Sequence, residues 1–460
     1  MEQSLYLGDN ILGIMGIILA SAFLIWGAYK KVAALPLMLG GSLIVVIFNW
    51  MPLWDSFAGA YITGYTGFFV NLFLVFIASM FFTKAMEETG SIIKIGYKFS
   101  EWFGPKRAIL VVFATTAILT YGGISLFVVV LAVAPLIMIL FKEANLPRSL
   151  AIGPLAAGAI TFTMKSLPYS PQATNVIPTG EAFFGTGLGA GAFIGILSAV
   201  LMIAGQLWYF KTSEKKVRES GEGFTYMEGT KEENYEVDRS TLPPTFKAFL
   251  PLILVVGLIV GLTWIPRLFN LNMNIPPNAI VVGSMLSAAV LALLLNMNKI
   301  RGIDHLKYII NEGMSGSIRA IAGPAAVVGF GGVVRASPAF AAIVNSLLNM
   351  DMNAYGMAAF GASVVGGVVG SSSAGLQVSL EVLAQPLLET GADPAILHRI
   401  AATFAGTFDS LPHSTVWFLI FPTLGVTHKE GYKHAFWTTV FWPTLAGLIV
   451  LFLAMLMYAY

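Results

Sequence analysis

The sequence predicts an all-α membrane protein made of two inverted repeats, each with crossing helices, one re-entrant hairpin and one broken helix. Hydrophobic residues make up 57% of the 460 residues and charged residues only 11%, and the mean hydropathy is +0.78. This composition leaves too little polar surface to coat a soluble protein of this length. Many apolar stretches also reach roughly the 17 to 25 residues that a helix needs to cross the hydrocarbon core. A motif that occurs twice predicts the repeat.

The repeated motif reads Ser-Leu-Pro, one further residue, and Ser. Its copies are Ser166–Ser170 and Ser410–Ser414, and each is followed after seven further residues by Pro-Thr. A hydrophobic helix that is interrupted at matching places in two halves of a chain is typical of transporters whose binding site lies near the membrane midplane. Proline and glycine are also common in membrane helices as simple kinks. Because two matched breaks occur, each behind a candidate hairpin, we favour a binding site over two kinks.

The first repeat is expected to span residues 1–210. Its apolar segments predict crossings near 11–29, 32–50 and 66–83, followed by an amphipathic cytoplasmic stretch. The segment 108–141 is apolar at both ends, is interrupted by glycines, and has basic residues at both flanks. Because both flanks favour the cytoplasm, this segment is predicted to be a re-entrant hairpin. A broken helix at about 149–185 and a returning crossing complete the repeat.

The second repeat follows a cytoplasmic linker, which we predict at 211–246 from its polar residues of mixed charge. It is expected to span 247–460 and to have the same plan, with three crossings near 248–266, 278–296 and 316–334, a hairpin at about 352–390, a broken helix at about 400–427 and a last crossing at 436–459. Each half then crosses the membrane five times. An odd number of crossings gives the second half the opposite orientation, so the sequence predicts an inverted repeat.

The basic residues predict the orientation in the membrane. Most of them fall on the side of the hairpin flanks and of the linker, and three arginines fall on the other side, namely Arg267, Arg335 and Arg399. By the positive-inside rule the side rich in lysine and arginine is cytoplasmic. We therefore expect a multi-pass protein of the plasma (inner) membrane with both termini external.

Several function classes are disfavoured by composition and motifs. The chain has no cysteine, and its five histidines show no metal-binding spacing. No phosphate-binding glycine loop or nucleophile elbow is present. The net charge of +2 is spread over loops and gives no footprint for nucleic acid. We therefore expect no catalytic residues, no metal, no cofactor and no nucleic-acid partner.

The breaks and the hairpin tips supply the candidate substrate-binding groups. Ser170-Pro171 and Ser414-Thr415 have the form of helix starts, where a hydroxyl caps the first turn. A half-helix that begins inside the membrane would point unpaired N–H groups and the positive end of its dipole at an anion such as a carboxylate. The candidate substrate-binding residues are Gly122, Gly123, Ser125, Ser170, Gln172, Asn175, Ser372, Ser373, Ser410, His413 and Ser414.

Two charged residues occupy equivalent places directly before the two motifs, Lys165 and Asp409. Ionisable groups at membrane depth are costly and are usually functional or paired. We expect Asp409 to belong to the site of the coupling ion, with His413 beside it as a second candidate. Lys165 would either pair with Asp409 or attract the substrate carboxylate. The alternative is a purely structural ion pair that holds the two breaks together.

Around both breaks the chain resembles the gluconate permease family of the ion transporter superfamily, and the resemblance extends from about Phe82 to the end. The residues that carry it are Phe162-Thr163-Met164, Leu167-Pro168, Ser170-Pro171-Gln172, Asn175, Ile177-Pro178-Thr179, Leu397-His398-Arg399, Asp409–His413 and Leu424–Glu430. Two departures are Lys165, where we expect a small or hydroxyl residue, and Ser414-Thr415-Val416, where a more polar run is expected.

The resemblance implies symport of a small hydroxylated or amino carboxylate, such as gluconate, hydroxybutyrate or serine, with a cation that is usually a proton. It also implies a homodimer in which each protomer has a scaffold and a transport domain that moves like an elevator. The departures leave the substrate and the choice between proton and sodium open. Two other interpretations are a cation/proton exchanger without an organic substrate, and an intramembrane enzyme or channel, for which no catalytic constellation or symmetric pore is visible.

Overall fold

The computed structural model describes residues 10–121, 126–168, 176–226, 241–269 and 275–458, and this part of the chain contains helices but no strand. Within these ranges, five helical stretches are long and apolar enough to cross a membrane. They are Ile11–Tyr29, Asp55–Glu88, Ala192–Ser220, Ile303–Arg335 and His428–Met457. Shorter apolar helices lie between them. The prediction of a multi-pass helical membrane protein is therefore confirmed.

The described helices follow one another in a similar order in the two halves of the chain. In both, long helices precede a short helix, a helical hairpin, an interrupted helix and a final long helix. The first half contains α1 (Ile11–Tyr29), α2 (Ala34–Phe48), α3 (Ile62–Glu88), α4 (Ser91–Phe103), α5 (Ala108–Tyr121), α6 (Leu126–Glu143), α7 (Arg148–Ile160), α8 (Phe162–Lys165), α9 (Val176–Phe184) and α10 (Ala192–Ser220). The second half contains α11 (Thr245–Leu268), α12 (Pro277–Leu295), α13 (Ile303–Arg335), α14 (Pro338–Leu348), α15 (Ala354–Val369), α16 (Ser372–Glu389), α17 (Pro394–Ala405), α18 (Trp417–Thr423), α19 (His428–Ala435) and α20 (Trp442–Met457).

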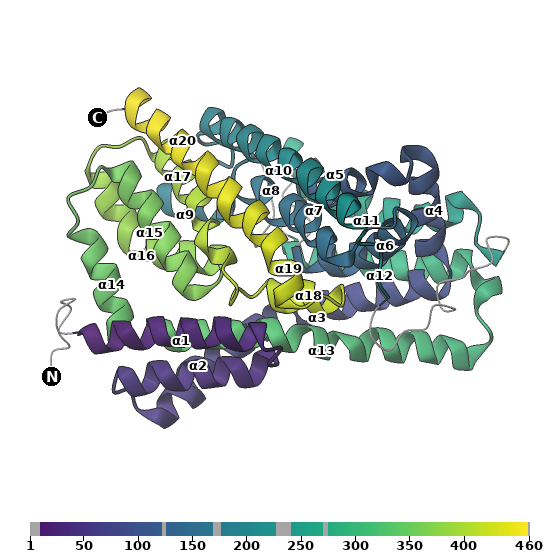
Figure 1. Cartoon of the computed structure of the whole chain (residues 1–460), viewed down its shortest axis with the longest axis horizontal. Coiled ribbons are helices and arrows are strands. Elements are labelled where there is room, and N and C mark those ends of the chain that lie inside the picture. Colours follow the sequence, from purple (N-terminus) through teal and green to yellow (C-terminus); the bar gives the residue numbers. More distant parts are fainter. Residues whose placement is uncertain (1–9, 122–125, 169–175, 227–240, 270–274, 459–460) are drawn as a thin grey trace.

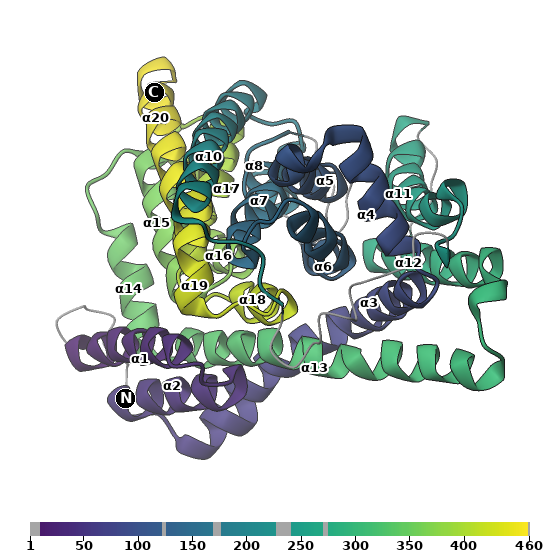
Figure 2. The ribbon, with the colours of Figure 1, turned by 45° about the vertical axis from the view of Figure 1, so that its right-hand side comes forward.

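The helices form two groups. Helices α1, α2, α3 and α13 form the lower layer in Figure 1, α12 packs against α3, and α11 packs against α12 and α4. The hairpins α5–α6 and α15–α16, with the interrupted helices, lie above that layer, and α10 runs beside α20 (Figure 2). The first described turns of α1 and the end of α20 lie at the same end of the molecule (Figure 1). Which face of the membrane this end occupies remains a prediction.

Glycines bring the long helices α3 and α13 into backbone contact. A Cβ atom on Gly64 would lie 2.6 Å from the carbonyl oxygen of Val328. One on Gly332 would lie 2.5 Å from the carbonyl oxygen of Ala60, in the π-helical segment Asp55–Tyr61 that leads into α3. No larger side chain fits at either place unless the helices move apart. Small residues that allow such close approach are the usual means of packing helices in a membrane. The close packing of α3 and α13 provides a rigid wall beside the hairpins.

Three predicted boundaries are wrong because charged residues continue a helix beyond its apolar part. The crossings predicted at 66–83 and 316–334 are longer in the structure, since α3 runs to Glu88 and α13 begins at Ile303. Here Glu88 lies 2.7 Å from Lys84 Nζ and 3.0 Å from His305 Nε2, which links the two helices. The predicted linker also begins too early, because α10 continues to Ser220 through an ion pair between Glu214 and Arg218.

Candidate functional site

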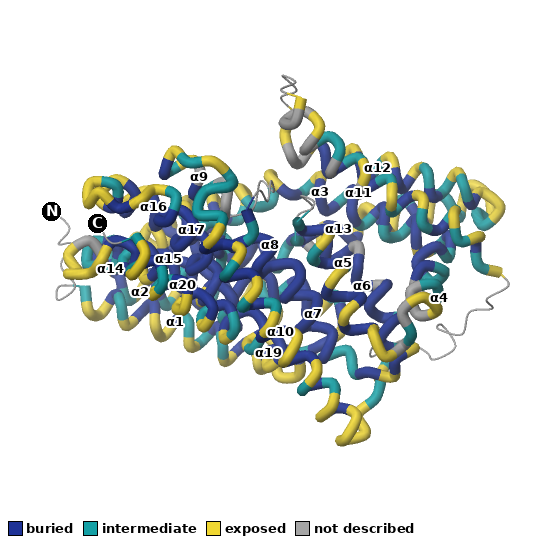
Figure 3. The backbone as a smooth tube through the Cα atoms, turned by 90° about the horizontal axis from the view of Figure 1, so that it is seen from above, coloured by how far each residue is buried: buried dark blue, intermediate teal, exposed yellow. Residues whose placement is uncertain are grey.

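Both predicted broken helices are interrupted in the structure. In the first half, α7 ends at Ile160, Thr161 leaves the helical conformation, and the single turn α8 ends at Lys165. In the second half, α17 ends at Ala405 with Gly406 as its C-cap, and a short 3-10 turn that contains Asp409 follows. Helices α7, α8 and α17 are among the most deeply buried parts of the molecule (Figure 3). The breaks therefore lie inside the protein.

The second break does not present the helix start that the sequence predicts. Helix α18 begins at Trp417, has no side-chain cap and is only seven residues long. The hydroxyl of Ser414 and the backbone N–H of Thr415 donate hydrogen bonds to the carbonyl oxygen of Gly370, at 3.1 and 3.3 Å. The expectation that Ser414-Thr415 caps a half-helix and exposes free N–H groups is therefore wrong. Both groups instead donate hydrogen bonds to the backbone at the tip of the second hairpin.

Each hairpin contacts the break of its own half. The second tip turns at Gly370, whose φ of +69° suits glycine, and α16 starts two residues later at Ser372. In the first half, the hydroxyl of Tyr121, the last residue of α5, donates to the carbonyl oxygen of Pro168 at 3.0 Å. The first tip itself, which includes the candidates Gly122, Gly123 and Ser125, lies outside the described residues, as do Ser170, Gln172 and Asn175.

Lys165 and Asp409 join the two breaks. The ammonium nitrogen of Lys165 lies 3.5 Å from Asp409 Oδ1 and donates to the carbonyl oxygen of Gly406 at 2.6 Å. Lys165 is fully buried and Asp409 nearly so. A Cβ atom on Gly406 would overlap the end of the lysine side chain, so the absence of a side chain there makes the contact possible. Of the roles considered for Lys165, the structure shows pairing with Asp409.

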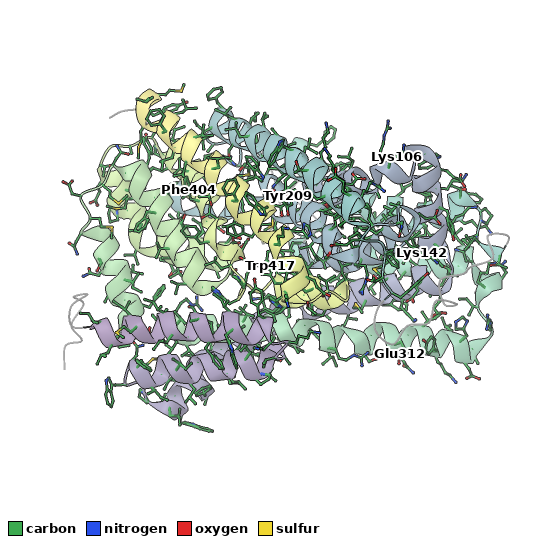
Figure 4. The ribbon with its side chains drawn as sticks, viewed as in Figure 1. Lys106, Lys142, Tyr209, Glu312, Phe404 and Trp417 are labelled. Carbon is green, nitrogen blue, oxygen red and sulfur yellow. The ribbon has the colours of Figure 1, made fainter. Side chains whose placement is uncertain are left out.

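The neighbours of Asp409 hold it in place. The hydroxyl of Ser410 donates to Asp409 Oδ1 at 2.9 Å. The carbonyl oxygen of Ser410 accepts from the indole N–H of Trp417 at 2.9 Å and from the hydroxyl of Tyr432 at 3.2 Å. Trp417 is fully buried near the middle of the molecule (Figure 4). Because several side chains fix this turn, the carboxylate keeps a defined position.

His413 is buried and bonded through one ring nitrogen. Its Nε2 lies 2.9 Å from the carbonyl oxygen of Gly367, which can only accept, so the hydrogen is on Nε2. Its Nδ1 has no hydrogen-bond partner among the described residues. The ring is therefore hydrogen-bonded to the second hairpin. Among the described residues, no hydrogen bond joins it to Asp409.

Arg399 is a second deeply buried cation, and the sequence analysis assigned it only to the external side. Its guanidinium donates to the carbonyl oxygens of Ser166, Leu188 and Ala190 at 2.6 to 3.1 Å. It therefore ties α17 of the second half to the first break and to the loop before α10. Side chains on Gly191 or Gly195 would clash with this arginine. Its bonds to backbone carbonyls indicate a structural role.

A cavity of about 540 Å³ lies between the α3–α13 wall and the second hairpin and break. Four of the predicted residues line it: Ser372, Ser373, Asp409 and Ser414. Three others, Lys165, Ser410 and His413, are buried but are not part of its lining. The residues from the opposite wall and from the first half are Thr63, Gly64, Gly67, Phe68, Asn71, Leu72, Leu126, Phe127, Ile160, Met164, Thr179, Val328 and Arg335.

Arg335 is the cavity residue that the sequence analysis missed as a site residue. It is the last residue of α13, its side chain is exposed, and it lines the cavity. No carboxylate pairs with it among the described residues. Its position in the sequence could have indicated a functional role, because an isolated arginine at the end of an apolar segment departs from the predicted distribution of basic residues. Gln377, on α16, also lines the cavity and was not predicted.

Comparisons with known proteins identify the family of the chain. The family model described as GntP family permease matches residues 11–457. The uncharacterized transporter YxjC of Bacillus subtilis (strain 168) is 30% identical over 412 residues, which cover 84% of this chain and 86% of YxjC. A solved structure of Neisseria gonorrhoeae MtrF, described with a class of antimetabolite efflux pumps, covers 95% of this chain at 13% identity and a TM-score of 0.40. The chain therefore belongs to the GntP permease family, and it is a multi-pass membrane transporter and not an enzyme.

Proposed function

We propose that this permease is a secondary active transporter that carries a small monocarboxylate by symport with a proton. The resemblance implies gluconate, hydroxybutyrate or serine as candidates, and of these we favour the two hydroxy acids. The observation that carries the proposal is the cavity at the second break, where Arg335 faces a space bounded by hydroxyl and amide groups. An arginine side chain binds a carboxylate through two parallel hydrogen bonds.

The charges around the cavity favour a substrate with one negative charge. Asp409 lines the cavity, but the ammonium of Lys165 lies 3.5 Å behind it and balances its charge. Arg335 has no acidic partner among the described residues, so one positive charge of the lining is uncompensated. A hydroxy acid with one carboxylate therefore suits the cavity better than a dicarboxylate or a zwitterionic amino acid.

The remaining polar groups suit the hydroxyls of such an acid. Side chains with both donor and acceptor capacity line the cavity from both walls, namely Thr63, Asn71, Ser371 and Gln377. The volume of about 540 Å³ lies within the range of roughly 300 to 1,000 Å³ that is common for small-molecule sites. These features support binding of a short, hydroxylated chain whose carboxylate lies at Arg335.

The arrangement of the two helix groups supports alternating access. Arg335 belongs to the α3–α13 wall, whereas Asp409 and Ser372 belong to the group of hairpins and broken helices. We propose that the two halves are inverted repeats, as in many secondary transporters, and that the hairpin group moves as an elevator against the α3–α13 scaffold. We also propose a homodimer in the plasma membrane, with the termini external and the linker cytoplasmic.

The test is uptake of labelled monocarboxylates into proteoliposomes that have an inward proton gradient. Wild-type protein is expected to accumulate the substrate. Arg335→Gln is expected to reduce kcat/KM for uptake by roughly 10- to 150-fold, because a charge-assisted hydrogen bond contributes about 1.5–3 kcal/mol. The control is Arg319→Gln, which removes an exposed arginine from the same helix outside the cavity lining. Equal loss in both variants, or none in Arg335→Gln, would contradict the role of Arg335.

The second candidate function is a cation/proton exchanger, which Asp409 favours because its carboxylate faces the cavity and could bind a cation there. The same vesicles separate the two functions. An exchanger moves protons when a cation gradient is applied and no organic acid is present. A symporter moves protons only when its carboxylate substrate is added.

A further inference from the structure

We infer that the ammonium group of Lys165 is a tethered cation that occupies the place where a metal coupling ion would otherwise bind, so that this permease does not use sodium. The inference rests on the proposed symport function and deepens it, because that function alone leaves the proton and sodium open. It follows from which oxygens meet at the second break and from what lies between them.

The oxygens at the second break are those that a broken-helix transporter offers to a cation. Gly406 is the C-cap of α17, so its carbonyl oxygen lies at the C-terminal end of a half-helix, where the helix dipole is negative. The carboxylate of Asp409 lies three residues further along the chain. In transporters with discontinuous helices, carbonyls at such ends, together with acidic side chains, coordinate sodium or bind protons. The second break therefore has the composition of a cation site.

The position between these oxygens is already filled. Lys165 Nζ lies 2.6 Å from the Gly406 carbonyl oxygen and 3.5 Å from Asp409 Oδ1. The lysine arrives from the first break and is fully buried, so it does not share this place with solvent. Because Gly406 has no side chain, the end of the lysine can lie directly against its backbone. The lysine thus supplies the positive charge that a bound metal ion would supply.

The local charges leave no room for a second cation. Asp409 is the only carboxylate within ion-pair distance of Lys165 among the described residues. This carboxylate is therefore already paired with the lysine ammonium. A sodium ion added here would be repelled by the ammonium and would find the Gly406 oxygen already bonded.

The competing explanation is that Lys165 and Asp409 form an ion pair with a structural role only. Removal of the lysine side chain distinguishes this explanation from a tethered cation. If Lys165 stands in for a metal ion, Lys165→Ala leaves a carbonyl oxygen, a carboxylate and an open space that sodium can enter. Lys165→Met removes the charge but fills the space. Lys165→Ala combined with Asp409→Asn opens the space but removes the charge that would hold the ion.

The experiment is thermal unfolding of the purified full-length permease in detergent, with sodium chloride or choline chloride at equal ionic strength. Wild type and Lys165→Met are expected to unfold at the same temperature in both salts. Lys165→Ala is expected to unfold about 2 °C or more higher in sodium, because an ion that binds only the folded state stabilises it. The variant that also carries Asp409→Asn is expected to lose this response.

Two results would overturn the inference. One is wild-type protein whose unfolding temperature rises in sodium relative to choline. The other is Lys165→Ala protein that elutes as a folded species and shows no sodium response. If Lys165→Ala does not fold, the inference is tested by uptake of labelled monocarboxylate by the wild-type protein at a fixed proton gradient. Replacement of choline by sodium is then expected to leave the uptake rate unchanged, and a change in rate would overturn the inference. If no carboxylate is taken up in either salt, the proposed symport function fails. The unfolding temperatures in sodium and choline still test whether Lys165 occupies a cation site.

Discussion

The two breaks have similar layouts and opposite charges. At the first, a half-helix ends and Lys165 follows five residues after Ile160; at the second, a half-helix ends and Asp409 follows four residues after Ala405. Among the described residues of the two breaks, only Asp409 of the second contributes a charge to the cavity lining. The first break supplies the cation that lies behind Asp409 and is itself held by Arg399. Repeated architecture therefore does not require repeated chemistry, because one copy carries the charge that lines the cavity and the other copy pairs with it.

The strongest test of this difference between the two breaks is to remove the charge from the second break alone. Asp409→Asn leaves the Lys165 ammonium buried without a counter-ion, which costs about 3–5 kcal/mol of folding free energy for a buried pair. We also expect gradient-driven uptake to be abolished. Thermal and denaturant unfolding measure the first effect and proteoliposome uptake the second.

The control for this prediction restores the charge balance. Asp409→Asn combined with Lys165→Met removes both charges and is expected to regain most of the lost stability but not the coupled uptake. Glu381→Gln, at an exposed carboxylate on α16, is expected to change neither property. Unchanged gradient-driven uptake in Asp409→Asn would remove this residue from the coupling role.

The next largest effect is expected at the arginine that links the second half to the first break. Arg399→Lys keeps the charge but loses the planar set of donors that reaches three carbonyl oxygens. We expect a loss of roughly 1.5–3 kcal/mol in unfolding free energy, because hydrogen bonds to a charged group are removed. Arg319→Lys, at an exposed arginine, serves as the matched control and should unfold like wild type. Equal stability of the Arg399→Lys variant would show that these carbonyl contacts contribute little.

The smallest of the three effects is expected at Gly406. Gly406→Ala places a methyl group on the end of Lys165, so the lysine must move away from Asp409. Overpacking of this kind costs about 1–3 kcal/mol. Gly283→Ala is the control, because this glycine on α12 faces open space. If Gly406→Ala unfolds like the control, the contact between Lys165 and the Gly406 carbonyl is not needed for the pair.

Much of the helical layout could be predicted from the sequence because apolar length and chain breakers are local properties. The first crossing, predicted at 11–29, coincides with α1, and the hairpin predicted at 108–141 corresponds to α5 and α6. The end of α10 at Ser220 was missed, because ion pairs between residues four apart stabilise a helix that composition alone classifies as a linker.

The site was predictable in part, from the charged residues at the two breaks and from the serines Ser372 and Ser373 at the second hairpin tip. Lys165 and Asp409 stood out because ionisable residues are rare within apolar segments. Ser414 was assigned to the wrong partner, because a capping serine accepts hydrogen bonds from the first N–H groups of its helix, whereas this hydroxyl donates to the carbonyl oxygen of Gly370. Arg335 reaches the cavity only because α13 packs against α3 beside the second hairpin, and such tertiary contacts leave no mark in the local sequence.

Proton movement gives the most direct test of symport. Proteoliposomes that contain a pH-sensitive dye and have no preset gradient receive an external monocarboxylate, such as gluconate or hydroxybutyrate. We expect acidification of the interior with wild-type protein and with Arg319→Gln, and none with Arg335→Gln. Acidification that needs a cation gradient and no carboxylate, or uptake of the acid without any proton movement, would contradict proton-coupled symport.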